Sequence, residues 1–170
     1  SIETTFVSTD RFNQRAFKRW VETRPATDIN HYELTNGRIV MTPPAGWGHG
    51  EIEARMSRIL FDFVDSNKLG KIFGSSTGYS LPSGDTLEPD VSFIATSRWL
   101  KGPQVGRGHF LKIVPNLVVE ILSPATAQRD RIEPATAPGA TGRGAELVPA
   151  LGQVGADLVE QLGRERARAN

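Results

Sequence analysis

The chain has 170 residues, the size of one ordinary domain with a buried core. Its 20 Lys+Arg and 19 Asp+Glu give a net charge of +1, so the overall charge indicates neither a polyanionic nor a polycationic partner. The absence of cysteine excludes disulfides, thiolate zinc sites and cysteine nucleophiles. Without a bilayer-length apolar run or a signal-peptide pattern at the N-terminus, we expect a cytoplasmic protein with no membrane partner.

The first elements are a helix and a hairpin. Apolar residues at helical spacing predict a helix over 10–23. Strand-like runs at 31–34 and 38–41 flank the dipeptide Asn36-Gly37. Asn-Gly between two such runs is a strong hairpin signal because both residues tolerate a positive φ.

The longest helix is predicted over 49–67, after a Pro-rich loop. Its apolar stripe, which predicts a face packed on a sheet, consists of Ile52, Met56, Ile59, Leu60, Phe63 and Val64. Strands are predicted over 71–73, 79–81 and 91–95. The nearly continuous apolar run at 117–122 predicts a central strand that is buried on both faces.

A composition break divides the chain. Every aromatic residue lies at or before Phe110, and residues 131–170 contain no aromatic, Lys, Ser, His or Met. We therefore predict a domain over 1–133 and an Ala/Gly/Pro/Arg-rich tail over 134–170. The tail is either a flexible linker followed by a weak helix or the product of a shifted reading frame, and the sequence leaves both alternatives open.

Two acidic residues stand out near predicted strands. Glu120 lies inside the apolar 117–122 run, where a carboxylate is costly to bury unless it is paired or binds a metal. Asp90 immediately precedes the 91–95 strand. Singly, each has a structural explanation, as a strand-end Glu that reaches solvent and as a turn cap. Together with the main-chain carbonyl of Ile121, the two carboxylates would form a hard oxygen site suited to Mg²⁺ or Mn²⁺.

These motifs resemble those of a known superfamily. The segments EPDVSFI (88–94) and PNLVVEILSP (115–124) are similar to the motifs of the PD-(D/E)XK restriction-endonuclease-like superfamily, and within it to a large bacterial family of small stand-alone endonucleases. The resemblance covers residues 10–133. It implies an α/β fold with a mixed central sheet flanked by helices. It also implies Mg²⁺- or Mn²⁺-dependent hydrolysis of DNA, with Asp90 and Glu120 as the catalytic, metal-holding residues.

The family pattern adds further candidates. The helix after His49 supplies a third acid, which would be Glu51, and Glu33 in the hairpin matches another typical position. The alternative for Glu51 is a solvated glutamate in the first turn of the helix. The alternative for His49 is a helix-start or pocket-lining residue rather than a ligand. We also expect helix arginines and the loop at Trp47 to contact backbone phosphates.

The family lysine is missing. Its usual place, two residues after Glu120, holds Leu122, and the other family place, beyond Arg129-Asp130, also lacks a lysine. Arg131 is a candidate substitute, but its guanidinium is a fixed charge rather than a proton-transfer group. We therefore expect an endonuclease that is impaired.

Two rival functions remain. One is a catalytically inactive, degenerate family member that binds nucleic acid or has no function. The other is a glycosidase with paired carboxylates, which the scattered tryptophans disfavour. The expected loss of the C-terminal helix and strand would leave a sheet edge uncovered, and such an edge favours self-association into a homodimer.

Overall fold

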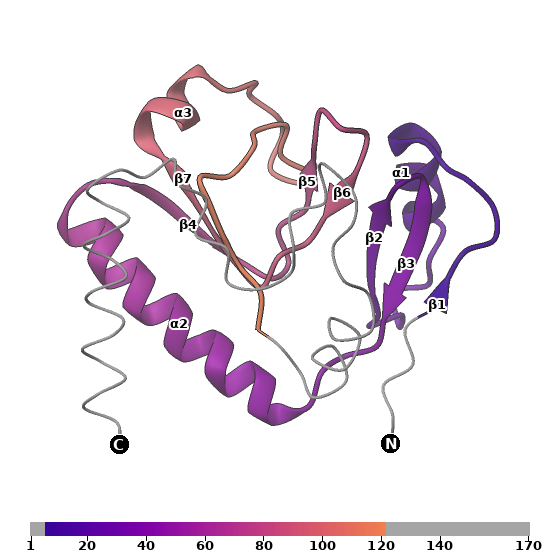
Figure 1. Ribbon diagram of the computed structural model, residues 1–170, viewed down its shortest axis with the longest axis horizontal. Coiled ribbons are helices and arrows are strands. Elements are labelled where there is room, and N and C mark those ends of the chain that lie inside the picture. Colours follow the sequence, from indigo (N-terminus) through magenta and orange to yellow (C-terminus); the bar gives the residue numbers. More distant parts are fainter. Residues whose placement is uncertain (1–5, 122–170) are drawn as a thin grey trace, which may run out of the picture.

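The computed structural model describes residues 6–121, which form an α/β fold (Figure 1). In chain order the elements are β1 (Phe6–Val7), α1 (Gln14–Glu22), β2 (His31–Thr35), β3 (Arg38–Thr42), α2 (Trp47–Ser66), β4 (Gly70–Gly74), β5 (Tyr79–Ser80), β6 (Thr86–Leu87), β7 (Val91–Ala95), α3 (Thr96–Lys101) and β8 (Leu117–Val119). The predicted tail over 134–170 lies outside the described residues, as do Leu122 and Arg131. In the described part of the chain, no helix combines the length and apolar character that a membrane span requires.

The strands divide between two sheets. One has the order β1-β3-β2-β6-β5 and the other the order β4-β7-β8. The strand pairs are antiparallel, and an isolated parallel bridge joins Tyr79 to Leu111. The predicted α/β class is confirmed, but within residues 6–121 the strands form two sheets of antiparallel pairs, whereas the sequence predicted one mixed central sheet.

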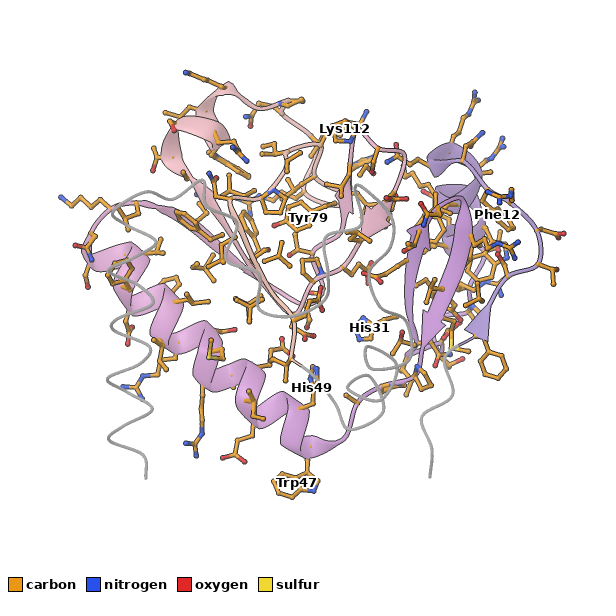
Figure 2. The ribbon with its side chains drawn as sticks, viewed as in Figure 1. Phe12, His31, Trp47, His49, Tyr79 and Lys112 are labelled. Atoms are coloured by element: carbon orange, nitrogen blue, oxygen red, sulfur yellow. The ribbon has the colours of Figure 1, made fainter. Side chains whose placement is uncertain are left out.

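The predicted hairpin is present as β2 and β3. Asn36 and Gly37 form its two-residue turn with φ angles of 51° and 73°. A type I′ turn needs a positive φ at both positions, and its twist matches that of the flanking strands. Leu34 packs against α1 through the fully buried Phe17. Phe12, just before α1, packs against the same cluster (Figure 2).

The first helix starts later than the sequence predicted. Asn13 caps α1, because its side chain accepts a hydrogen bond of 2.8 Å from the N–H of Ala16. Asn is a favoured N-cap residue, since its side-chain oxygen satisfies a free N–H of the first turn. The helix therefore begins at Gln14, and residues 10–13, which the sequence placed in the helix, precede it.

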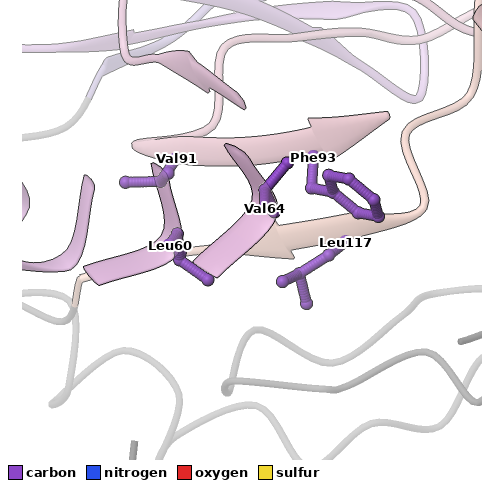
Figure 3. Close-up of a cluster of buried hydrophobic side chains, with 5 residues drawn as sticks. All are labelled: Leu60, Val64, Val91, Phe93 and Leu117. Atoms are coloured by element: carbon purple, nitrogen blue, oxygen red, sulfur yellow. The ribbon is translucent and has the colours of Figure 1, made fainter. Parts of the chain in front are cut away.

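The long helix α2 packs on the second sheet. Leu60 and Val64 contact Val91, Phe93 and Leu117, and these five side chains form one buried cluster (Figure 3). The helix begins two residues before the predicted start. Ile52, at the N-terminal end of the predicted apolar stripe, is 49% exposed. This end of the stripe therefore does not pack on the sheet as predicted.

The central strand of the second sheet is β7. Its first four residues are buried, and β4 and β8 pair with it on either side. Phe93 faces α2, whereas Ile94 joins a different cluster with Tyr79 and Ile113. The sequence placed the doubly buried strand at 117–122. There the structure has the shorter β8, which ends before Glu120.

Candidate metal centre

Three potential metal ligands converge where α2 approaches the start of β7. His49 and Glu53 are four residues apart on α2, so they lie on one face of the helix. Asp90 immediately precedes β7. One ligand atom of each residue lies within 4.8 Å of the others, and all three residues are half-buried. We call these three residues the metal cluster.

Two groups orient Asp90. The main-chain N–H of Ile121 donates a hydrogen bond of 2.6 Å to Asp90 Oδ2. His49 Nε2 lies 3.3 Å from the same oxygen, and the two side chains are only 18% and 16% exposed. This carboxylate therefore links α2 to the segment that follows β8.

Glu53 is held by a serine that follows β4. Ser75 Oγ donates a hydrogen bond of 2.8 Å to Glu53 Oε1. Ser75 directly follows β4, and β4 packs against α2. The second carboxylate of the metal cluster thus has an orientation fixed by the sheet, rather than the freedom of a surface glutamate.

The hairpin adds a further layer of polar groups. Side chains alternate along β2, so Leu34 faces α1 while His31 and Glu33 face the opposite side. Glu33 Oε1 accepts a hydrogen bond of 2.9 Å from the N–H of Glu88. His31 Nδ1 lies 3.5 Å from Glu88 Oε2. Figure 2 shows His31 and His49 approaching the same region from β2 and α2.

The acidic surroundings act on His31. Its pKa is raised from the ordinary value of 6.5, chiefly by the hydrogen bond to Glu88, while burial works in the opposite direction. The charges of Glu88, Asp90 and Glu53 add to the rise. The negative charges of Asp90 and Glu53 in the metal cluster therefore act on His31, although the side chain that pairs with it is that of Glu88.

The structure brings two of the sequence-predicted site residues together and leaves Glu51 outside. Asp90 and His49 are in the metal cluster. Glu51 is exposed and forms an ion pair of 2.7 Å with Arg55. Each helical residue advances about 100°, so Glu51 points to solvent while Glu53 lies on the face of His49. The acid of α2 that lies beside His49 and Asp90 is therefore Glu53.

Three further predicted residues, Glu120, Ile121 and Glu33, lie within the described part of the chain. Glu120 follows β8 directly and is half-buried. Continuing the β7–β8 register by one pair beyond Val91 and Val119 aligns Glu120 with Asp90, and residues directly opposite share one face. Ile121 is at the site, where its N–H donates the hydrogen bond to Asp90; the metal-ligand role of its carbonyl stays a prediction. Glu33 is linked to the metal cluster through its hydrogen bond with the N–H of Glu88, in the 88–90 segment.

Three residues at the site were missed by the sequence analysis. Glu53 could have been found from its i,i+4 spacing to His49, and His31 from its i,i+2 spacing to Glu33 on a strand. Ser75 carries no such signal, since it lies 22 residues from Glu53. Its role depends on the packing of α2 against β4.

The donor set suits a hard divalent cation in part. Carboxylates are typical ligands of Mg²⁺ and Mn²⁺, whereas imidazole is more typical of softer transition metals. Glu53 and Asp90 are like charges at short range, and a bound cation would relieve their repulsion. The residues therefore fit a divalent metal, with His49 either as a ligand or as the partner that orients Asp90.

Comparisons with known proteins confirm the predicted restriction-endonuclease-like fold. The model of the Uma2 family, described as "Putative restriction endonuclease", matches residues 16–137. A solved structure from Anabaena variabilis, described as "a putative nuclease belonging to DUF820", has a TM-score of 0.53 and 19% identity to the chain. The match covers 71% of this chain and 64% of that one, so the chain spans less than two thirds of its length. No curated protein sequence gives a significant match.

Proposed function

The chain belongs to the Uma2 family of restriction-endonuclease-like proteins, and from this premise we propose that it is a metal-dependent endonuclease that hydrolyses DNA phosphodiester bonds. One observation carries the proposal. The ligand atoms of His49, Glu53 and Asp90 lie within 4.8 Å of one another at the junction of α2 and β7. Family membership and this convergence are independent of each other, and both favour a nuclease.

We assign the metal-holding role to Asp90, Glu53 and Glu120. When bound, Mg²⁺ or Mn²⁺ stabilises the charge that develops on a phosphate under attack and acidifies a water molecule. Ile121 and Ser75 hold the carboxylates of Asp90 and Glu53 by hydrogen bonds of 2.6 and 2.8 Å. Such preorganisation means that little reorientation is needed when substrate arrives.

Activity is expected to be weak. The family lysine would place a cation beside the scissile phosphate, and loss of one such stabilising group typically costs about 10²–10³ in rate. Lys112 does not replace it, since it lies on the opposite side of the molecule from His49 (Figure 2). The strand β8 begins only at Leu117, so Lys112 is not on the strand that leads to Glu120.

The alternative is an inactive family member that still binds DNA. The observation in its favour is the same absent lysine, at position 122 and after Arg129-Asp130. An intact metal site without the lysine would bind cation and nucleic acid but would not turn over. Cleavage and metal binding must therefore be measured separately.

The test is nicking of supercoiled plasmid by the full chain in Mg²⁺ or Mn²⁺. We expect slow nicking that Asp90→Asn and Glu120→Gln abolish. The matched control is Asp62→Asn, because Asp62 is an acid on α2 that is 65% exposed and pairs with Arg58 outside the metal cluster. Absence of nicking together with metal binding by the wild-type chain would favour the inactive alternative. Efficient cleavage would contradict the argument from the missing lysine.

A further inference from the structure

Helix α1 exposes a basic face. Phe17 is fully buried against Leu34, whereas Arg15, Lys18 and Arg19 are exposed. Arg15 and Arg19 are one helical turn apart, which separates them by about 6 Å along the axis. Their side chains therefore project side by side from the helix.

Positive charge in the described part of the chain is concentrated around this helix. Residues 10–24 contain five basic and two acidic side chains. Residues 25–121 contain nine basic and ten acidic side chains. The near-zero net charge of the whole chain thus conceals one basic segment beside a nearly neutral remainder.

The arginines of α1 differ from those of α2 in their pairing. Arg55 and Arg58 on α2 form i,i+4 ion pairs with Glu51 and Asp62, at 2.7 and 3.6 Å. On α1, Lys18 pairs with Glu22 at 3.4 Å.

Within residues 6–121, neither Arg15 nor Arg19 forms a salt bridge. These two guanidinium groups are thus available to an external anion, and a planar guanidinium can contact a phosphate through two hydrogen bonds.

This face is separate from the metal cluster. Leu34 of β2 points toward α1, while Glu33 points to the opposite side of the hairpin, toward Glu88. Figure 1 shows α1 and α2 at different ends of the fold. The acidic metal cluster repels a phosphate backbone until a cation is bound, so a DNA-acting protein of this design needs a basic surface elsewhere to hold its substrate.

We propose that Arg15 and Arg19 on the exposed face of α1 form a docking surface for the sugar-phosphate backbone of duplex DNA. The choice of DNA among polyanions rests on the proposed function, and the surface itself rests on charge complementarity. Contacts of this kind position a protein on DNA without reading its sequence. Binding here is independent of divalent metal, because the metal cluster takes no part in it.

The experiment measures binding of the full chain to a labelled DNA duplex by fluorescence anisotropy in EDTA, over a series of salt concentrations. The slope of log K against log salt is negative, and each lost phosphate contact reduces its magnitude by about 0.9. We therefore expect Arg15→Ala/Arg19→Ala to reduce the magnitude of the slope by about 2 and to weaken binding roughly 60-fold near 0.1 M salt.

The matched control is Arg55→Ala/Arg58→Ala, which removes the same charge from exposed but paired positions on α2. The sequence led us to expect phosphate contacts from helix arginines in general, and the proposal restricts them to Arg15 and Arg19 because Arg55 and Arg58 are held in ion pairs. The control should therefore leave slope and affinity close to those of the wild type. Arg15→Lys/Arg19→Lys keeps the charges and should keep the slope. Circular dichroism and thermal melting establish that each variant is folded.

Equal loss of affinity in the α1 and α2 double variants would overturn the proposal, because the effect would then follow net charge alone. Failure of the wild-type chain to bind DNA in EDTA would also overturn it. So would binding to anionic phospholipid vesicles that depends on Arg15 and Arg19 while DNA binding does not. Failure of the proposed nuclease function gives a different result, namely DNA binding that depends on α1 without nicking in Mg²⁺ or Mn²⁺.

Discussion

The side chain of Glu33 accepts a hydrogen bond of 2.9 Å from the main-chain N–H of Glu88, across 55 residues of sequence. This contact ties the β2–β3 hairpin to the 88–90 segment that carries Asp90. Pro89, between the two acids, is fully buried. The position of the Asp90 carboxylate thus depends on Glu33, a residue of the other sheet.

This relationship predicts different outcomes for two substitutions. Glu33→Gln keeps an oxygen that can accept from Glu88, so metal affinity measured by calorimetry should change little. Glu33→Ala removes the acceptor, leaves the N–H of Glu88 without this partner and should weaken metal binding. An equal loss in both variants would mean that the charge of Glu33 itself serves the metal.

The two glutamates of the first turns of α2 should behave oppositely. Glu53→Gln should reduce Mn²⁺ affinity by about 10-fold or more, because it neutralises one of the ligands gathered within 4.8 Å. Glu51→Gln should bind Mn²⁺ like the wild type, since Glu51 is exposed and pairs with Arg55. Calorimetric titration of both variants is the measurement. The reverse order of affinities would restore Glu51 as the helix ligand.

His31 should titrate above its ordinary pKa of 6.5. A raised pKa in the folded state stabilises the protein fully below pH 6.5, and this contribution is lost as the pH rises through the folded-state value. Glu88→Gln removes the first cause of the shift, so it should lower the pKa and destabilise the protein more at pH 5.5 than at pH 8.5. NMR titration of His31 and denaturation at the two pH values test this. A stability difference that is the same at both would contradict it.

The same histidine reports on the metal centre. Asp90 and Glu53 contribute to the raised pKa of His31 through their charges. A cation held by these carboxylates offsets that charge, so saturating Mg²⁺ should lower the pKa of His31. The Glu53→Gln variant should show a smaller response. An unchanged titration in Mg²⁺ would place the cation away from these groups.

Leu60 should carry a large share of the packing between α2 and β7. It is 1% exposed inside the cluster drawn in Figure 3, so Leu60→Ala should cost about 2–5 kcal/mol of unfolding free energy. Phe61, its neighbour on the same helix, is 55% exposed, and Phe61→Ala should cost less than about 1 kcal/mol. Chemical denaturation compares the two. Similar losses would indicate that Phe61 is also buried in solution.

The sequence by itself determined the features that depend on neighbouring residues. Asn36-Gly37 specified the hairpin because a tight turn requires a positive φ at both positions. Helical spacing located α2, and the burial cost of a carboxylate singled out Glu120. The motifs at 88–94 and 115–124 indicated the family to which the chain belongs.

Only the tertiary structure decided which side chains meet. Glu51 and Glu53 are equally acidic and two residues apart, and the packing of Leu60 and Val64 on β7 sets the rotation of α2 that brings Glu53 to Asp90. The sequence likewise left the strand order open, because the runs at 91–95 and 117–122 are both apolar. Only the structure shows that the first of these, β7, is the central strand and pairs with a neighbour along each edge. Local sequence fixes the period of an element, whereas contacts between distant elements fix the direction in which each of its faces points.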